Sequence, residues 1–73
     1  MPRMDPRKQF AENLRRAREA RNISQESLAD SSGLHWTEIS RLERGIREPK
    51  LTTIVRLARG LGIPAARLLD DIS

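Results

Sequence analysis

The sequence predicts an all-α fold, with five short helices in one small domain. Apolar residues recur at helical spacing along most of the 73-residue chain, and the alternation of Val, Ile and Thr that marks strands is missing. Asp, Asn, Ser, Gly and Pro interrupt the apolar pattern where helices would begin and end. At this length one domain is expected over residues 1–73, with a core of about 6–70.

The first helix is expected from Pro6 to about Arg21. Asp5 suits the N-terminal cap, and a proline suits the first helical position because its missing N–H would have no partner there. Asn22, which tolerates a left-handed backbone, is expected to end the helix. The expected buried face comprises Phe10, Leu14 and Ala17.

The second and third helices are expected close together in the chain. Ser24 caps the second helix, and Ser31–Gly33 is a turn signal that ends it. The third helix is expected from about Trp36 to Arg44, with Gly45 as its stop. The expected core positions of the two helices are Leu28, Ala29, Ile39 and Leu42.

A loop and two more helices complete the expected fold. Pro49 disfavours helix at the residue before it, so residues 45–50 are expected as a loop and the fourth helix begins near Leu51 or Thr52. Gly62 ends the fourth helix, and Pro64 opens the fifth. The expected core positions are Leu51, Ile54, Leu57, Ala58 and Leu61 in the fourth helix and Leu68 in the fifth.

Composition and charge narrow the function classes. The chain carries 14 Lys and Arg against 10 Asp and Glu, a net charge of +4, which favours a polyanionic partner. It has no Cys, one His and no Gly-rich phosphate loop, so no metal site, cofactor or catalysis is expected. Its longest stretches without a charged residue span seven positions, too few for a membrane span. The basic start lacks the apolar run of a secretory signal, so a cytoplasmic, nucleoid-associated protein is expected.

Residues 25–44 resemble the twenty-residue helix-turn-helix unit. That unit needs a small residue at its fifth position, where two helices cross, and Ala29 is there. Its ninth position needs a residue that tolerates positive φ, and Gly33 is there. The apolar positions of the unit, its fourth, tenth, fifteenth and eighteenth, are Leu28, Leu34, Ile39 and Leu42. Six matches at fixed spacing make this a strong signal.

A wider resemblance covers roughly residues 10–69. Residues 23–29, 39–45 and 57–63, together with Pro49, are similar to the five-helix phage repressor and Cro class, also called the xenobiotic response element class. Within that class the chain resembles the stand-alone controller proteins of restriction-modification systems, which have a similar length. The resemblance implies a sequence-specific, dimeric transcriptional regulator of double-stranded DNA, a repressor or autoregulatory controller at a palindromic operator.

The resemblance also implies which residues contact DNA. It makes the third helix the recognition helix, with Trp36, Thr37, Ser40 and Arg41 as the base-reading positions. Arg41 suits a bidentate contact to guanine, Thr37 suits a base edge or a thymine methyl, and Ser40 is a weak, adaptable reader. The implied phosphate contacts are Ser24, Gln25, His35, Arg44, Arg47 and Lys50.

Alternatives stay open for several residues on this surface. Trp36 could instead pack at the start of its helix against Ile39, and His35 could serve only as a helix cap. Glu38 either accepts a hydrogen bond from a cytosine amino group or faces solvent.

Two further sets of residues are expected away from the DNA. By the resemblance, Arg18 and Glu43 form an interior salt bridge between the first and third helices. Val55, Leu69 and Ile72 are expected at a homodimer interface, with ordinary core packing as the alternative. A dimer is expected because one recognition helix reads about four or five base pairs, too few to select a promoter.

Two other functions fit the composition. The first is an antitoxin-like protein-interaction module on the same scaffold, with DNA binding secondary; a toxin or RNA polymerase is the candidate protein partner. Salt separates this module from a DNA regulator, because phosphate binding weakens steeply as salt rises. The second is a basic amphipathic peptide at a membrane surface, which the five capped helices and the internal pair of Arg18 and Glu43 argue against.

Overall fold

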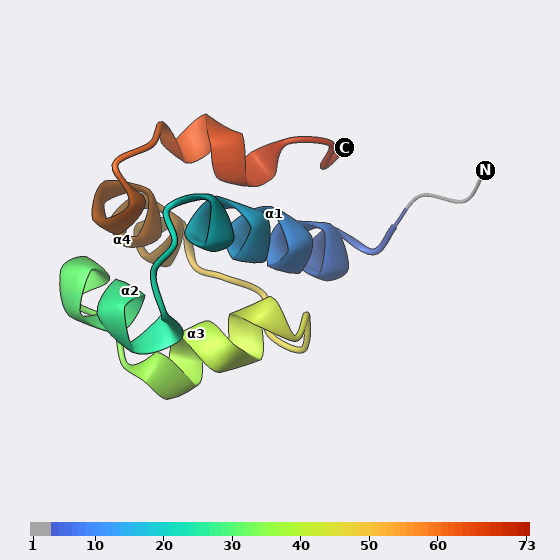
Figure 1. Ribbon diagram of the computed structural model, residues 1–73. Helices are drawn as coiled ribbons and strands as arrows, with labels where there is room; N and C mark the ends of the chain where they lie inside the picture. Colours follow the sequence, from blue (N-terminus) through green and yellow to red (C-terminus); the bar gives the residue numbers. More distant parts are fainter. Residues whose placement is uncertain (1–3) are drawn as a thin grey trace.

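The computed structural model describes residues 4–73, and all regular elements in this range are helical (Figure 1). Their bounds are α1 (Pro6–Ala20), α2 (Gln25–Ser32), α3 (Trp36–Glu43), α4 (Leu51–Leu61) and η1 (Ala65–Leu69). The predicted all-α class is confirmed, and α2 and α3 occupy the two ends of the expected helix-turn-helix unit. The predicted domain spans residues 1–73, and its first three residues, part of the basic N-terminal stretch, lie outside the described residues.

The expected fifth α-helix is a 3₁₀ helix of five residues. Pro64 precedes it without a side-chain cap, and Asp71 has a left-handed backbone with a φ of 65° soon after it ends. In so short a stretch the tighter i to i+3 bond closes a turn with fewer residues, as from Arg67 N to Pro64 O at 3.0 Å. The prediction of five α-helices is therefore wrong in its last element.

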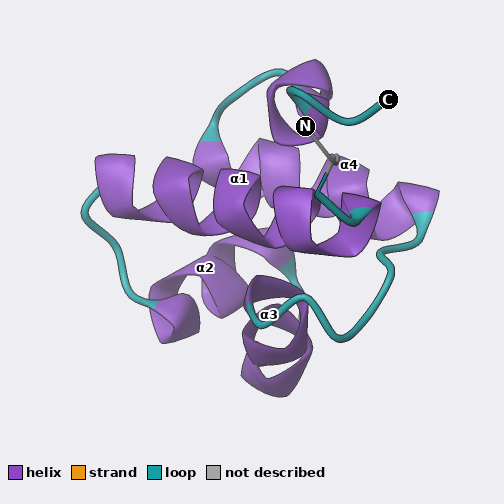
Figure 2. Cartoon of the chain, turned by 90° about the vertical axis from the view of Figure 1, so that its right-hand side faces the viewer, coloured by secondary structure: helices purple, strands orange, loops and turns teal. Residues whose placement is uncertain are grey.

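Helix α1 lies between the other elements. It packs against α3 on one side and against η1 on the other, so α3 and η1 lie on opposite sides of it (Figures 1 and 2). Helix α2 packs against both α3 and α4, and α4 packs against η1. The N-terminal part of the helix-turn-helix unit is thus held by α4, and its second helix is held by α1.

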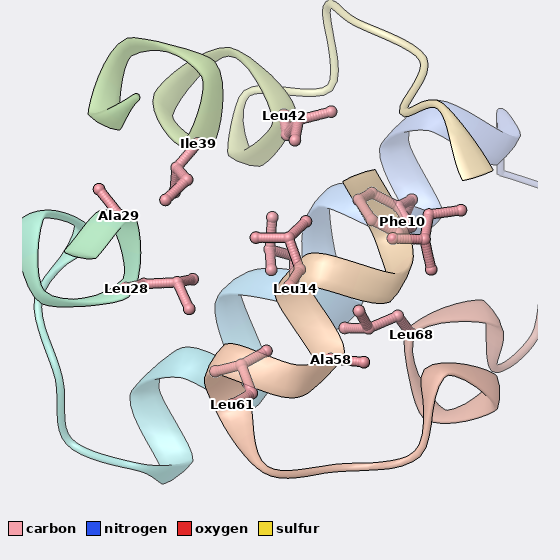
Figure 3. Close-up of a cluster of buried hydrophobic side chains, with 11 residues drawn as sticks. Phe10, Leu14, Leu28, Ala29, Ile39, Leu42, Ala58, Leu61 and Leu68 are labelled. Carbon is pink, nitrogen blue, oxygen red and sulfur yellow. The ribbon is translucent and has the colours of Figure 1, made fainter. Parts of the chain in front are cut away.

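The core gathers one apolar stripe from each α-helix and one leucine from η1 (Figure 3). These stripes follow helical spacing, which places residues three and four apart on the same face. Residues Ala17, Ile23, Leu34 and Ile63 pack against the edge of the cluster as predicted. The cluster comprises Phe10, Leu14, Leu28, Ala29, Ile39, Leu42, Ile54, Leu57, Ala58, Leu61 and Leu68.

Leu51 corrects the prediction for the core. It was expected on the inner face of α4, but 76% of its surface is exposed. The buried face of α4 includes Thr53 and, four and eight residues later, Leu57 and Leu61. Leu51 lies to one side of that stripe, at the helical position where α4 begins, and no neighbouring element covers it. The structure thereby leaves a large apolar side chain on the surface.

The helix ends follow the capping residues of the sequence. The Asp5 carboxylate accepts a hydrogen bond from Arg7 N at 2.8 Å, and the Ser24 hydroxyl accepts one from Ser27 N at 3.0 Å. Gly33 ends α2 with a φ of 74°, a left-handed conformation that costs glycine little. This turn lets α3 begin three residues later, as the helix-turn-helix unit requires.

Asn13 fastens the C-terminal segment to α1. Its buried amide nitrogen donates to the carbonyl oxygens of Leu68 at 3.0 Å and Asp70 at 2.7 Å. Its amide oxygen accepts a hydrogen bond from Gln9 Nε2 at 3.1 Å. Because a buried amide needs partners for both ends, this set of bonds fixes where η1 lies on α1.

Candidate nucleic-acid interface

Helix α3 presents a polar stripe on the side away from the core. Its buried residues are Ile39, Leu42 and Glu43. Thr37, Arg41 and Arg44 are spaced i, i+4 and i+7, which places them together on the opposite side. Ser40 is half-buried beside this stripe. Three of the predicted DNA contacts therefore lie along one outward line of the helix, with Arg41 and Arg44 exposed and Thr37 half-buried.

Trp36 lies at the edge of this surface, where α3 begins. Half of its surface, 50%, is exposed, so it is not a core residue packed beneath α3. It lines a shallow depression together with Ser24 and Gln25 at the start of α2. The structure thus brings a predicted base-reading residue next to two predicted phosphate contacts.

His35 caps α3 through its side chain. Its Nδ1 accepts a hydrogen bond from Thr37 N at 3.4 Å, and it lies 2.9 Å from Thr37 Oγ1. The predicted cap is therefore present. The contact also joins His35 to Thr37, a predicted base reader, which sequence spacing alone does not indicate.

A nearly buried ion pair joins α1 to α3. Arg18 Nε lies 2.6 Å from Glu43 Oε2, and Arg18 Nη2 lies 3.0 Å from Glu43 Oε1. The hydrogen bonds that Arg18 donates to the Glu43 carboxylate raise the pKa of the Arg18 guanidinium above its usual value, against the opposing effect of burial. Arg18 Nη1 also donates to the Ile23 carbonyl oxygen at 2.9 Å, in the α1–α2 connection. The pair therefore fixes α3 relative to α1 and the start of α2.

Gln25 joins this ion pair. Its Nε2 donates to Glu43 Oε1 at 3.1 Å, which uses one of the two N–H bonds on that nitrogen. The second N–H and the backbone N–H at the start of α2 stay available for a phosphate. Sequence reasoning missed the link to Glu43 because the two residues are 18 positions apart and meet only in the folded chain.

The predicted phosphate contacts after α3 follow its outer end. Arg47 Nη1 lies 3.6 Å from Glu38 Oε1, so Glu38 meets an arginine of the following loop rather than solvent alone. Arg44 Nε donates to Ser40 O at 3.4 Å, and Lys50 is exposed just before α4. The basic residues of this loop therefore extend the cationic surface of α3 toward α4.

The three predicted interface residues differ in their surroundings. Leu69 is exposed over 44% of its surface, and Val55 is half-buried on α4. Ile72 packs against the core cluster. Leu51, four residues before Val55, adds the most exposed large apolar side chain among residues 4–73. Sequence reasoning missed Leu51 because helical spacing assigned it to the core.

A helix-turn-helix family model matches residues 14–68, which include α2, α3, α4 and the C-terminal part of α1. The chain belongs to the helix-turn-helix family. This confirms the resemblance stated from the sequence. Helices α2 and α3 are the two helices of the helix-turn-helix unit.

Relatives in the helix-turn-helix family include named regulators. The control protein C.SmaI of Serratia marcescens is 44% identical over 66 residues, which cover 90% of this chain and 79% of that protein. The cryptic phage CTXphi transcriptional repressor RstR of Vibrio cholerae is 34% identical over 62 residues, which cover 85% of this chain and 56% of that protein. The solved structure of the restriction-modification controller protein C.AhdI from Aeromonas hydrophila matches with a TM-score of 0.83 and 39% identity, covering 85% of this chain and 94% of that one.

Within residues 4–73, the His, Asp and Glu side chains form no group of three that could hold a metal ion. No helix in that range is both long enough and apolar enough to cross a membrane.

Proposed function

We propose that this protein is a sequence-specific, dimeric regulator of transcription that binds double-stranded DNA, a repressor or autoregulatory controller. The observation that carries this proposal is the stripe of Thr37, Arg41 and Arg44 on the outward side of α3, whose first residue, Trp36, lies beside the start of α2. The similarity to C.SmaI, a control protein, and to RstR, a transcriptional repressor, supports it and favours a regulator over an antitoxin-like module. Catalysis has no part in this proposal, and the protein acts where its DNA is, in the nucleoid.

In this proposal α3 enters the major groove along this stripe. Arg41 donates two hydrogen bonds to guanine O6 and N7, the contact for which its planar fork is suited. Thr37 and Ser40 contact neighbouring base edges from the same face. Trp36, at the edge of the stripe, meets the sugar-phosphate backbone or the outermost base.

Phosphate contacts then fix the register of α3 on the duplex. Ser24, Gln25 and His35 lie at the N-terminal ends of α2 and α3, where backbone N–H groups attract anions. Arg47 and Lys50 follow α3 in the loop before α4 and reach the adjacent backbone. These contacts hold the helix in place without reading sequence.

A second copy of this chain completes the site. The C-terminal groove is lined by the apolar Phe10, Ile54 and Leu69 and is edged by Arg7 and Glu48, which carry opposite charges. A twofold axis through this face would bring the arginine of each copy toward the glutamate of the other, as a self-complementary interface requires. The side chains proposed for this interface are the exposed Leu51 and Leu69 and the half-buried Val55, with Ile72 at its inner edge.

Duplex selection from a random pool tests the proposed function. An enriched palindrome with half-site centres about 34 Å apart is expected, because a twofold pair of recognition helices reads one helical turn apart. The absence of any enriched sequence would refute sequence-specific recognition. An enriched sequence without twofold symmetry would refute the dimer.

Fluorescence anisotropy with the selected duplex tests the phosphate contacts. Arg47→Ala should weaken binding to all duplexes alike and reduce the slope of log K against log salt by about 0.9. Arg67→Ala is the matched control, because it removes the same charge from η1, on the opposite side of α1 from α3. Equal losses in both variants would show that only net charge matters and would contradict the assigned surface.

A further inference from the structure

The contact between His35 and Thr37 limits the hydrogen bonds that Thr37 can offer to DNA. His35 Nδ1 faces two groups of the same residue: the backbone nitrogen of Thr37 at 3.4 Å and its hydroxyl oxygen at 2.9 Å. A backbone N–H can only donate, so a ring nitrogen that faces it as the cap of α3 has to accept. Nδ1 therefore carries no proton, and the single ring proton of the neutral imidazole lies on Nε2.

The position of that proton decides the direction of the second contact. With an unprotonated Nδ1 at 2.9 Å, the hydroxyl of Thr37 donates its only hydrogen to His35. A proton on Nδ1 would reverse this bond, but it would also point at the Thr37 backbone N–H and remove the cap of α3. The Thr37 oxygen consequently has no hydrogen left to donate and can act toward DNA only as an acceptor.

We propose that His35 sets the hydrogen-bond polarity of Thr37, so that Thr37 selects a base that offers a donor in the major groove. Such donors are the N6 amino group of adenine and the N4 amino group of cytosine. Guanine O6 and N7 and thymine O4 are acceptors, and an oxygen whose hydrogen is committed to His35 gains nothing from them. This inference rests on the proposed function, since it assigns a base class to one contact of the same surface.

The amount of discrimination follows from one hydrogen bond. To donate to guanine or thymine, the Thr37 hydroxyl would have to leave His35 and give up that bond. A typical intramolecular hydrogen bond is worth about 0.5–1.5 kcal/mol, which corresponds to about two- to tenfold in binding. We therefore expect adenine or cytosine to be preferred over guanine or thymine by about that factor at the base facing Thr37.

Three variants test this with the selected duplex and its single-base changes. Thr37→Val removes the hydroxyl with little change in shape and locates the base pair, because the preference should disappear at that position alone. His35→Ala should reduce the preference at the same position about two- to tenfold, because the hydroxyl is then free to donate as well as accept. His35→Asp is the control, because its carboxylate caps a helix and can only accept, so the preference should persist while its negative charge weakens every duplex alike. Circular dichroism would show that all three remain helical.

A measurement without DNA tests the same geometry. Nitrogen-15 NMR of the imidazole at about pH 8, above the usual titration range of histidine, should show the proton on Nε2. A proton on Nδ1, or an unchanged base preference in His35→Ala, would overturn the inference. If the parent protein selects no duplex, the proposed function fails and the inference fails with it. If the parent selects a duplex and His35→Ala shows the same base preference, only the inference is refuted.

Discussion

Replacing Arg18 with methionine removes the cation of the buried ion pair while keeping a long side chain in its place. The Arg18 and Glu43 side chains are 15% and 5% exposed, so solvent can do little to stabilise the carboxylate that remains. The variant loses the contacts of 2.6 Å and 3.0 Å to Arg18, and within residues 4–73 only the side-chain amide of Gln25, at 3.1 Å, still donates to that carboxylate. Removing one partner of a buried pair typically costs about 3–5 kcal/mol.

That loss is large for a domain of this size. At the usual 0.05–0.15 kcal/mol per residue, the free energy of unfolding of this chain is about 4–11 kcal/mol, so Arg18→Met should lose about a quarter of it or more. Urea denaturation followed by circular dichroism measures the loss, and urea is preferred to guanidinium because it does not screen charges. Arg16→Met is the matched control, since its side chain is 73% exposed and its nearest carboxylate oxygen, on Glu12, is 3.9 Å away. We expect the control to change stability by about 0.5 kcal/mol or less.

A double variant separates the buried charge from lost packing. Arg18→Met combined with Glu43→Leu removes both charges, and it should be more stable than Arg18→Met alone because no charge stays buried without a partner. A loss below about 1 kcal/mol in Arg18→Met, or strictly additive losses in the double variant, would refute the reasoning. A small loss would mean that solvent reaches the Glu43 carboxylate in the variant. Additive losses would mean that Arg18 and Glu43 act independently.

Four further predictions concern the recognition surface, the interface and the first helix. Arg41→Ala should lose about 1–3 kcal/mol of discrimination at one base pair per half-site while nonspecific binding persists; competition with single-base operator variants measures it, and an unchanged preference everywhere would remove Arg41 from the base readers. Leu69→Glu should separate the dimer without unfolding it, as sedimentation equilibrium beside the parent would show; a parent that is monomeric at tens of micromolar would contradict a stable interface in the absence of DNA. Trp36 emission should shift or be quenched by the selected duplex and recover at raised salt; constant emission at full binding by anisotropy would place Trp36 off the DNA. Hydrogen bonds from the Arg7 side chain and backbone hold the pKa of Asp5 below its ordinary 3.8. The Asp5 carboxylate therefore stabilises the fold above that pH, and this stabilisation is lost as pH falls through the folded-state pKa. Acid denaturation of Asp5→Asn should lack this contribution, and identical acid transitions in both proteins would contradict it.

The sequence alone determined the local structure and the kind of surface. Capping residues such as Asp5, Ser24 and His35 satisfy backbone groups of their own helices, so their effect depends only on nearby positions. Helical spacing likewise separated the buried Ile39 and Leu42 from the outward face of α3. The all-α fold and the helix-turn-helix unit could be predicted for the same reason, because the unit is defined by residues at fixed short separations.

Only the tertiary structure decided how distant residues meet and where the core ends. Leu51 has the spacing of a core residue, but burial depends on whether another element covers that position, and none does. The last element is a 3₁₀ helix rather than an α-helix, and its place on α1 is fixed by the bond from Asn13 to Leu68 O, 55 residues away. Gln25 meets Glu43 across 18 residues, and Glu38 meets Arg47 only because the loop after α3 folds back toward it. Sequence periodicity shows which residues share a face of one helix, whereas contacts between elements depend on how the helices are placed in space.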